Sequence, residues 1–142
     1  MLMLWLAAIT ALTLAAIAMW HVYWALGGTR GLAAAIPQRE NHAVLFTPGP
    51  WGTLAVAGGL GALAVMALGG GLAWPPAVEL YPALAMGGGV FALRVVGDFR
   101  YVGVFKKVRG TRFSHWDDRL FTPLCLALAA ACWALAYGFS HP

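Results

Sequence analysis

Charged residues are scarce in this chain. Only 10% of its 142 residues are Asp, Glu, Lys or Arg, and 61% are hydrophobic, whereas a soluble domain carries about 25% charged residues. Acidic residues are rarer than basic ones, with five Asp and Glu against nine Lys and Arg. The only cysteines, Cys125 and Cys132, lie on one apolar segment and are too far apart along an intact helix to form a disulfide with each other. The composition excludes a soluble domain and predicts an integral membrane protein.

Motifs of common cofactor and nucleotide sites are also missing. The sequence has no Walker loop, no Rossmann fingerprint and no G-x-S-x-G motif. His21, His42 and His115 show no tight ligand spacing with Glu40 or Asp117, and His21 alone lies well within an apolar segment. We therefore expect no metal and no cofactor, and the sequence assigns no catalytic residue. No nucleic-acid motif accompanies the net charge of +4, so we expect no nucleic-acid partner.

Four apolar segments are long enough to cross a bilayer, which takes about 20 residues of helix. Helices are favoured over a barrel because the backbone in lipid needs internal partners and alternation of period two is absent. The first segment is predicted to be a retained helix, since no Lys or Arg precedes it and it exceeds the length of a signal sequence. The prediction is an all-α integral membrane protein, a four-transmembrane-helix bundle forming a single domain over residues 1–142. The predicted helices are residues 2–26, 51–72, 80–105 and 120–139.

Positive charge is divided unevenly between the predicted connections. Residues 27–50 contain Arg30 and Arg39, residues 69–78 contain no Lys or Arg, and residues 106–119 contain five. By the positive-inside rule, the first and third connections face the cytoplasm and both termini lie outside. We therefore expect a multi-pass protein of the inner (plasma) membrane. The local positive charge indicates contact with anionic headgroups of membrane lipids.

Small residues recur at the spacing that lets membrane helices approach closely, as at Ala57 and Gly61. The three consecutive glycines at 87–89 indicate either close packing or a bend that opens a cavity. Ser114 and Asp117 have the spacing of a capping box, which predicts that the fourth helix begins near His115 and bends at Pro123.

Two opposite charges interrupt the third apolar segment. Arg94 and Asp98 are four residues apart and would share one face of a continuous helix with Phe91 and Tyr101, so we expect them to pair. Ionisable groups within a membrane segment indicate a functional site. The alternative is a boundary pair, with Arg94 reaching the headgroups and Asp98 lying where the helix leaves the bilayer.

The predicted courses of the helices bring several polar residues to one level of the membrane. His21 ends the first helix, Arg94 and Asp98 end the third, and Asp117 begins the fourth. We expect these four to line one polar pocket open to the cytoplasmic leaflet, with His21 bonded to Asp98 or Asp117. Trp20, Trp24 and Tyr101 are candidate aromatic walls. The predicted ligand-binding residues are His21, Trp24, Arg94, Asp98, Tyr101 and Asp117.

Three groups of residues together resemble a known family. They are His21-x2-Trp24-Ala25-Leu26-Gly27-Gly28, Arg94-x2-Gly97, and Phe113-x3-Asp117-x5-Pro123-Leu124-Cys125. The combination resembles the bacterial membrane family called domain of unknown function 3995, over nearly the whole chain. The resemblance implies a small four-helix bacterial membrane protein and no activity. Its characteristic residues would be His21, Trp24, Arg94, Asp117 and Pro123, and Phe121 stands where the family pattern has Tyr.

Three classes of function agree with this sequence. The first is a binding or accessory bundle that holds a lipid-like or amphipathic small molecule, or packs on a membrane partner or a second copy. The second is an intramembrane enzyme in which His21 and an acid transfer protons on a lipidic substrate, as an isomerase does. The third is a transporter component. The direction of Arg94 discriminates among a pocket, an assembly surface and the headgroup boundary.

Overall fold

The helices of this protein follow its apolar segments. The computed structural model describes residues 1–74, 79 and 81–141, and every regular element within these ranges is helical. The four longer helices are α1 (Leu2–Ala25), α3 (Pro50–Gly71), α5 (Tyr81–Val96) and α7 (Thr122–Ser140). The short elements are α2 (Leu32–Ala35), α6 (Arg112–Trp116) and the π-helix η1 (Asp117–Phe121).

The first two predicted segments agree with α1 and α3 to within one residue at each end. The third prediction is wrong at its end, because α5 stops at Val96 and residues 97–105 form a loop. Gly97 ends the helix with a left-handed φ of 77°. The predicted start of this segment at Leu80, and residues 75–78 of the second predicted connection, lie outside the described residues.

Within the described residues, three helices are long and apolar enough to cross a membrane. They are α1, α3 and the continuous helical stretch Arg112–Ser140, which joins α6, η1 and α7. The fourth helix therefore begins at Arg112, before both the predicted segment start at residue 120 and the predicted helix start near His115. The described part of α5 is a shorter apolar helix of 16 residues, and at 1.5 Å per residue it is about 24 Å long.

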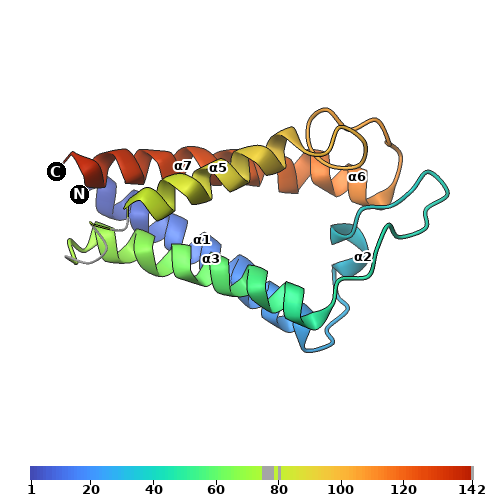
Figure 1. Cartoon of the computed structure of the whole chain (residues 1–142), viewed down its shortest axis with the longest axis horizontal. Coiled ribbons are helices and arrows are strands. Elements are labelled where there is room, and N and C mark those ends of the chain that lie inside the picture. Colours follow the sequence, from blue (N-terminus) through green and yellow to red (C-terminus); the bar gives the residue numbers. More distant parts are fainter. Residues whose placement is uncertain (75–78, 80, 142) are drawn as a thin grey trace.

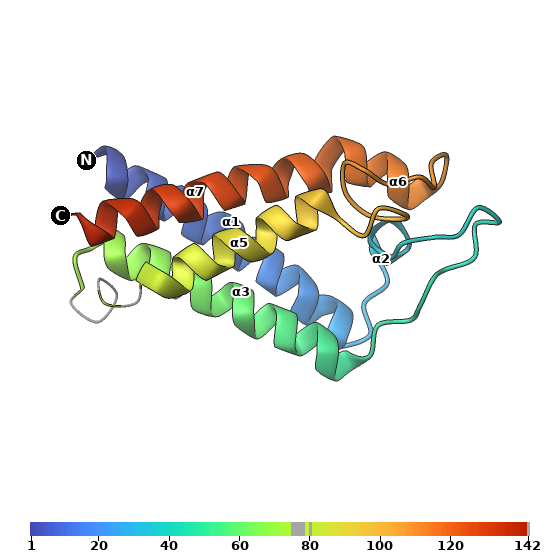
Figure 2. The same cartoon turned by 45° about the horizontal axis from the view of Figure 1, so that its top comes forward.

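The longer helices form two antiparallel hairpins. Helix α1 packs along α3, and α5 packs along α7 (Figure 1). Both chain termini lie at one end of the molecule, called here the terminal end. The first connection (residues 27–49) and the third connection (residues 97–111) lie at the opposite end, called here the loop end. The hairpins meet at the terminal end and diverge toward the loop end, as Figures 1 and 2 both show.

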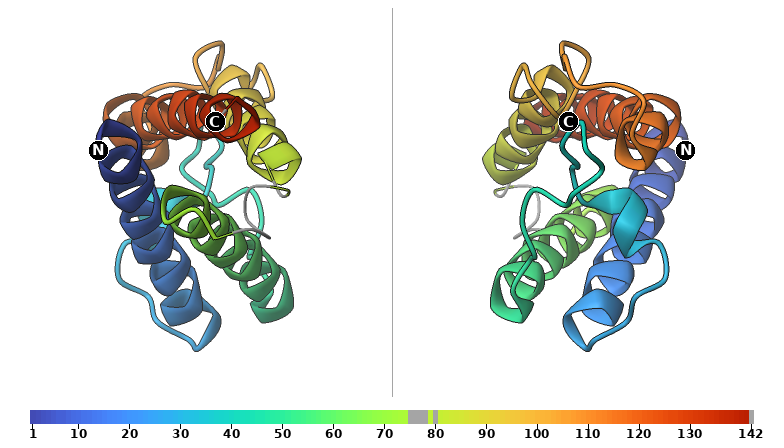
Figure 3. Two further views of the ribbon diagram at one scale, coloured as in Figure 1. Left: turned by 90° about the vertical axis from the view of Figure 1, so that its left-hand side faces the viewer. Right: turned by 90° about the vertical axis from the view of Figure 1, so that its right-hand side faces the viewer.

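Small residues let the hairpins approach each other at the terminal end. A Cβ atom at Gly70 of α3 would collide with the ring of Phe139 of α7. A Cβ at Gly138 of α7 would collide with Met3 of α1. Figure 3 shows the molecule end on, with both termini on the side that faces the viewer in the left view. Close backbone approach therefore holds this end of the molecule together.

Two of the three consecutive glycines, Gly87 and Gly88, serve close packing. Gly87 lies against Leu63 of α3, and a Cβ at Gly88 would lie 2.6 Å from the ring of Trp133 of α7. The same Trp133 donates a hydrogen bond from Nε1 to the carbonyl oxygen of Ala85, at 3.0 Å. Helix α5 runs without interruption through this stretch. Of the two sequence-based alternatives, close packing is confirmed at Gly87 and Gly88, whereas nothing lies within 4 Å of a Cβ at Gly89.

The first connection leaves α1, extends across the loop end to the hairpin of α5 and α7, and returns to α3. Its short helix α2 packs against α6. Beyond α2, Gln38 Oε1 accepts a hydrogen bond from the backbone N–H of Phe113 at 3.3 Å. Ala34, Ile36 and Phe113 are buried. The divergent hairpins are thus joined a second time at the loop end.

Candidate functional site: the charged loop end

Asp117 is the centre of the charged groups at the loop end. Its side chain is fully buried. Oδ1 accepts a hydrogen bond from Arg94 Nη2 at 2.7 Å. Oδ2 accepts two more, from the backbone N–H of Gly103 and from Lys106 Nζ, each at 3.0 Å. Both carboxylate oxygens are therefore engaged by donors, two of which carry positive charge.

Lys106 is the second buried charge, with a side chain that is 0% exposed. Its Nζ also donates to the carbonyl oxygen of Gly103 at 3.1 Å and to Asp118 Oδ1. Asp118 in turn accepts from Arg109 Nη1 at 3.2 Å. We call this cluster the ion network, and its members are Arg94, Lys106, Arg109, Asp117 and Asp118. The ion network joins the third connection to the end of α5 and to η1.

Local backbone structure brings Asp117 to this position. Thr111 caps α6, because its Oγ1 accepts from the N–H of Ser114 while Ser114 Oγ accepts from the N–H of Thr111. The capping box therefore lies three residues earlier than the predicted Ser114 to Asp117. Asp117 opens the π-helix η1, in which the N–H of Thr122 donates to the carbonyl oxygen of Asp117. Pro123 follows and has no N–H for the regular bond, which favours the wider turn.

The predicted pair of Arg94 and Asp98 is wrong. Helix α5 ends at Val96, so the two residues do not share a helical face. A Cβ at Gly97 would also collide with the carbonyl group of Val102, which explains why glycine stands at the bend. Arg94 instead forms its ion pair with Asp117 of η1, in the helix that packs along α5. The boundary alternative, in which Arg94 reaches the headgroups, stays a prediction, and Asp98 lies two residues beyond the end of α5.

Asp98 organises the turn that follows α5. Its Oδ1 accepts hydrogen bonds from the backbone N–H groups of Arg100, Tyr101 and Val102, at 2.9, 2.7 and 2.9 Å. Partial burial raises the pKa of Asp98, but the three N–H donors favour the carboxylate more strongly. The pKa of Asp98 therefore lies below its ordinary value.

His21 and Trp24 stabilise the end of α1. His21 Nδ1 lies 2.8 Å from the carbonyl oxygen of Ile17, and its ring lies edge-on to Trp24 with centroids 5.2 Å apart. Trp24 Nε1 donates to the carbonyl oxygen of Arg30 at 2.8 Å. The predicted hydrogen bond from His21 to Asp98 or Asp117 is not formed among the described residues. His21 is bonded within its own helix instead.

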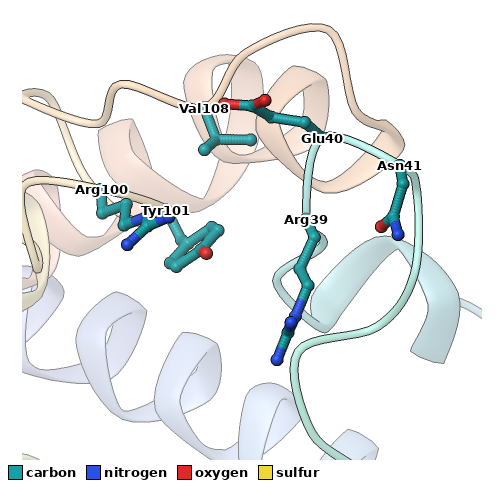
Figure 4. A pocket seen from close by; sticks show the side chains of 6 residues that line it. All are labelled: Arg39, Glu40, Asn41, Arg100, Tyr101 and Val108. Carbon is teal, nitrogen blue, oxygen red and sulfur yellow. The ribbon is translucent and has the colours of Figure 1, made fainter.

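Two of the cavities that the described residues form lie at the loop end. The larger, of about 530 Å³, is lined by Met19, Trp20, Tyr23 and Arg30. The smaller, of about 290 Å³, lies between the first and third connections and is lined by Arg39, Glu40, Asn41, Arg100, Tyr101 and Val108 (Figure 4). Of the six predicted ligand-binding residues, Tyr101 lines one of these cavities. Arg94 and Asp117 meet in the ion network, Asp98 holds the turn, and His21 and Trp24 lie at the end of α1.

Lys106 and Gly103 are members of the site that sequence reasoning missed. Lys106 stands beside Lys107 in a basic stretch, and the pair has the pattern of a solvated surface. The structure buries Lys106 and exposes Lys107. Because this difference depends on the position of Asp117 in the folded chain, no local signal distinguishes the two lysines.

The fold and the site define an all-helical protein with membrane-length apolar helices and a loop end joined by buried ion pairs. The chain belongs to the family described as protein of unknown function DUF3995, whose model matches residues 14–132. This confirms the resemblance, and the matched range includes His21, Arg94 and Asp117. No curated protein and no solved structure matches the chain.

Proposed function

We propose that this protein is a multi-pass inner-membrane protein that binds an anionic amphipathic molecule at its loop end, without catalysing a reaction. The observation that carries the proposal is the coincidence of exposed cations with aromatic side chains at that end. Exposed Lys and Arg residues there are Arg30, Arg39, Arg100, Lys107, Arg109, Arg112 and Arg119. Such a surface suits a molecule with a negative head and an apolar body.

The larger cavity supports this binding role. Trp20 and Tyr23 lie beside each other with ring centroids 5.7 Å apart, and Arg30 is near enough to place a positive charge at the same cavity. Aromatic rings of this kind suit the boundary between headgroups and hydrocarbon. The positive-inside rule supports a cytoplasmic loop end, because all nine Lys and Arg residues lie between residues 30 and 119 and none lies near either terminus.

The hydrogen bonding of the candidate acid supports binding rather than proton transfer. Both oxygens of Asp117 are engaged by Arg94, Lys106 and a backbone N–H, and the side chain is 0% exposed, so the carboxylate is shielded from a substrate. A general base has to reach the proton that it takes. Within this proposal Arg94 and Asp117 shape the loop end, Trp24 and His21 hold the end of α1, and Tyr101 contacts the ligand.

Mass spectrometry of co-extracted molecules tests the proposal. The wild type is purified in mild detergent beside a variant with Trp20→Ala and Arg30→Gln, and beside Trp5→Ala as a control that removes an exposed Trp from the terminal end. We expect an anionic amphiphile to be enriched with the wild type and the control, and depleted with the double variant. Identical profiles from all three proteins would overturn the proposal.

A further inference from the structure

The smaller cavity at the loop end, here called the crevice, is built by two segments that are distant in sequence. Arg39, Glu40 and Asn41 come from the first connection, and Arg100 and Tyr101 come from the third. Figure 4 shows Arg100 and Tyr101 on one side of the crevice and Arg39 and Asn41 on the other. A site made from both connections exists only in the folded chain.

The backbone on both sides of the crevice is fixed by hydrogen bonds. Arg39 donates its N–H to the carbonyl oxygen of Ala43 at 2.8 Å and accepts from the N–H of His42 at 2.9 Å, which closes a tight reversal. On the other side, the carbonyl oxygen of Arg100 accepts from the N–H groups of Lys107 and Val108, at 3.0 and 2.8 Å. The two guanidinium groups are therefore carried by defined turns rather than by open loops.

The charge of the crevice favours an anion. Neither Arg39 nor Arg100 forms an ion pair among the described residues, where the ion pairs belong to the ion network. Glu40 contributes one negative charge to the lining, so the three charged side chains sum to one positive charge. Arg100 also lies over the ring of Tyr101, with its Cζ 5.2 Å from the ring centroid. This contact orients a guanidinium while leaving its N–H donors available.

The donors and the size of the crevice indicate which anion it would take. Guanidinium groups bind phosphate oxygens through paired N–H donors, and the Tyr101 hydroxyl and Asn41 amide add neutral donors. A volume of about 290 Å³ is at the small end of ligand sites and suits a headgroup rather than a whole lipid. Val108, which is buried, closes the crevice with an apolar side chain.

We propose that the crevice between the two connections binds a phosphate group through Arg39 and Arg100, with Tyr101 and Asn41 as further donors. This inference rests on the proposed function, because it names the chemistry of the anionic head that the loop end would hold. The phosphate belongs either to a lipid headgroup or to a soluble phosphate ester, and both share the recognition described here.

Native mass spectrometry titrations in neutral detergent test the assignment with four probes. These are short-chain phosphatidylglycerol, short-chain phosphatidylcholine, glycerol 3-phosphate and inorganic phosphate. For the variant Arg39→Gln with Arg100→Gln, we expect affinity for phosphatidylglycerol to fall by about tenfold or more, since hydrogen bonds to charged groups are lost. Lys107→Gln with Arg119→Gln removes the same charge from the loop end outside the crevice and should change affinity by less than about twofold.

The probes separate the sources of the phosphate. Binding of phosphatidylglycerol without glycerol 3-phosphate supports a lipid, and binding of both supports any phosphate ester. Arg39→Lys with Arg100→Lys keeps the charge and loses the paired donors, so an intermediate affinity is expected even if the Gln variant folds poorly. Wild-type affinity in the Gln variant, or an equal loss in the Lys107/Arg119 control, overturns the crevice while leaving the proposed function intact. Equal affinity of the wild type for phosphatidylglycerol and phosphatidylcholine, which both carry a phosphate and differ in net charge, overturns the proposed function.

Discussion

Among the described residues, Arg94 forms its ion pair with Asp117, and this pairing can be measured. Asp117 accepts a hydrogen bond from Arg94 at 2.7 Å, whereas Asp98 is occupied with three backbone N–H groups. In detergent unfolding, Arg94→Gln and Asp117→Asn should therefore be coupled by about 0.5–3 kcal/mol, the range for residues in contact. The measurement is a double-mutant cycle on the free energy of unfolding.

The same cycle with Asp98→Asn is its control. Asp98 belongs to the turn after α5. The changes in the free energy of unfolding caused by Asp98→Asn and by Arg94→Gln should therefore add to within about 0.5 kcal/mol. Strong coupling of Arg94 to Asp98, together with none to Asp117, would restore the pair that the sequence suggests and contradict the ion network.

Protonation of Asp98 should loosen the turn at residues 98–102. Its folded-state pKa is lowered, so its stabilising contribution is present above the unfolded pKa and is lost as the pH falls through the folded pKa. NMR titration of the Asp98 carboxyl should give a midpoint below the ordinary aspartate value, with the amide signals of Tyr101 and Val102 following the same curve. Asp98→Asn should abolish the change of the Tyr101 and Val102 amide signals at low pH. A midpoint of the Asp98 titration at or above the ordinary aspartate value would refute the prediction.

Sequence reasoning located the residues of the site better than it located their contacts. Arg94 is predicted to belong to a site because charge within an apolar segment is costly, and Asp117 because it begins the fourth helix at the same level. The two residues meet in the structure. Their pairing could not be predicted, since it depends on the crossing of α5 and the last helix. Spacing along the chain favoured Asp98, because the rule for residues four apart holds only while the helix continues.

Adjacent glycines in α5 should respond oppositely to substitution. Gly88 lies against Trp133, whereas nothing lies within 4 Å of a Cβ at Gly89. Gly88→Ala should lower the free energy of unfolding by about 1–3 kcal/mol through overpacking. Gly89→Ala should raise it by up to about 1 kcal/mol, because Ala is the better helix former. Thermal and denaturant unfolding of both variants in one detergent measures the difference, and equal effects would contradict the α5–α7 packing described here.

Helix bounds were predictable where the apolar run and the helix end together. This holds for α1 and α3, whose ends follow the loss of hydrophobic residues. It fails for α5, because Val102, Val104 and Phe105 continue the apolar pattern beyond Gly97. The helix ends there for a conformational reason, the left-handed φ of Gly97 and the turn held by Asp98, which a measure of hydrophobicity does not record.

For the whole molecule, the proposed orientation gives a test of topology. Both termini lie at one end and the cations lie at the other. If the loop end faces the cytoplasm, alkaline phosphatase fused after Pro142 should be active outside, and a fluorescent protein that folds only in the cytoplasm should be dark there. The same reporters inserted after Lys107 should give the reverse pattern. A fluorescent C-terminal fusion to the full chain would contradict the orientation.

The hairpins contact each other at the terminal end and again at the loop end, where the first connection packs on α6, so the molecule has the outline of a closed triangle. The hairpins are two sides that meet at the terminal end, and the first connection, packed on α6, is the third. Helix α1 has 24 residues, so this side is about 36 Å long and one degree of rotation about the apex moves its far end by about 0.6 Å. A triangle keeps its angles while its sides keep their lengths. Any change in the angle between the hairpins must therefore stretch or detach the brace, the segment that carries Arg39 and Asn41.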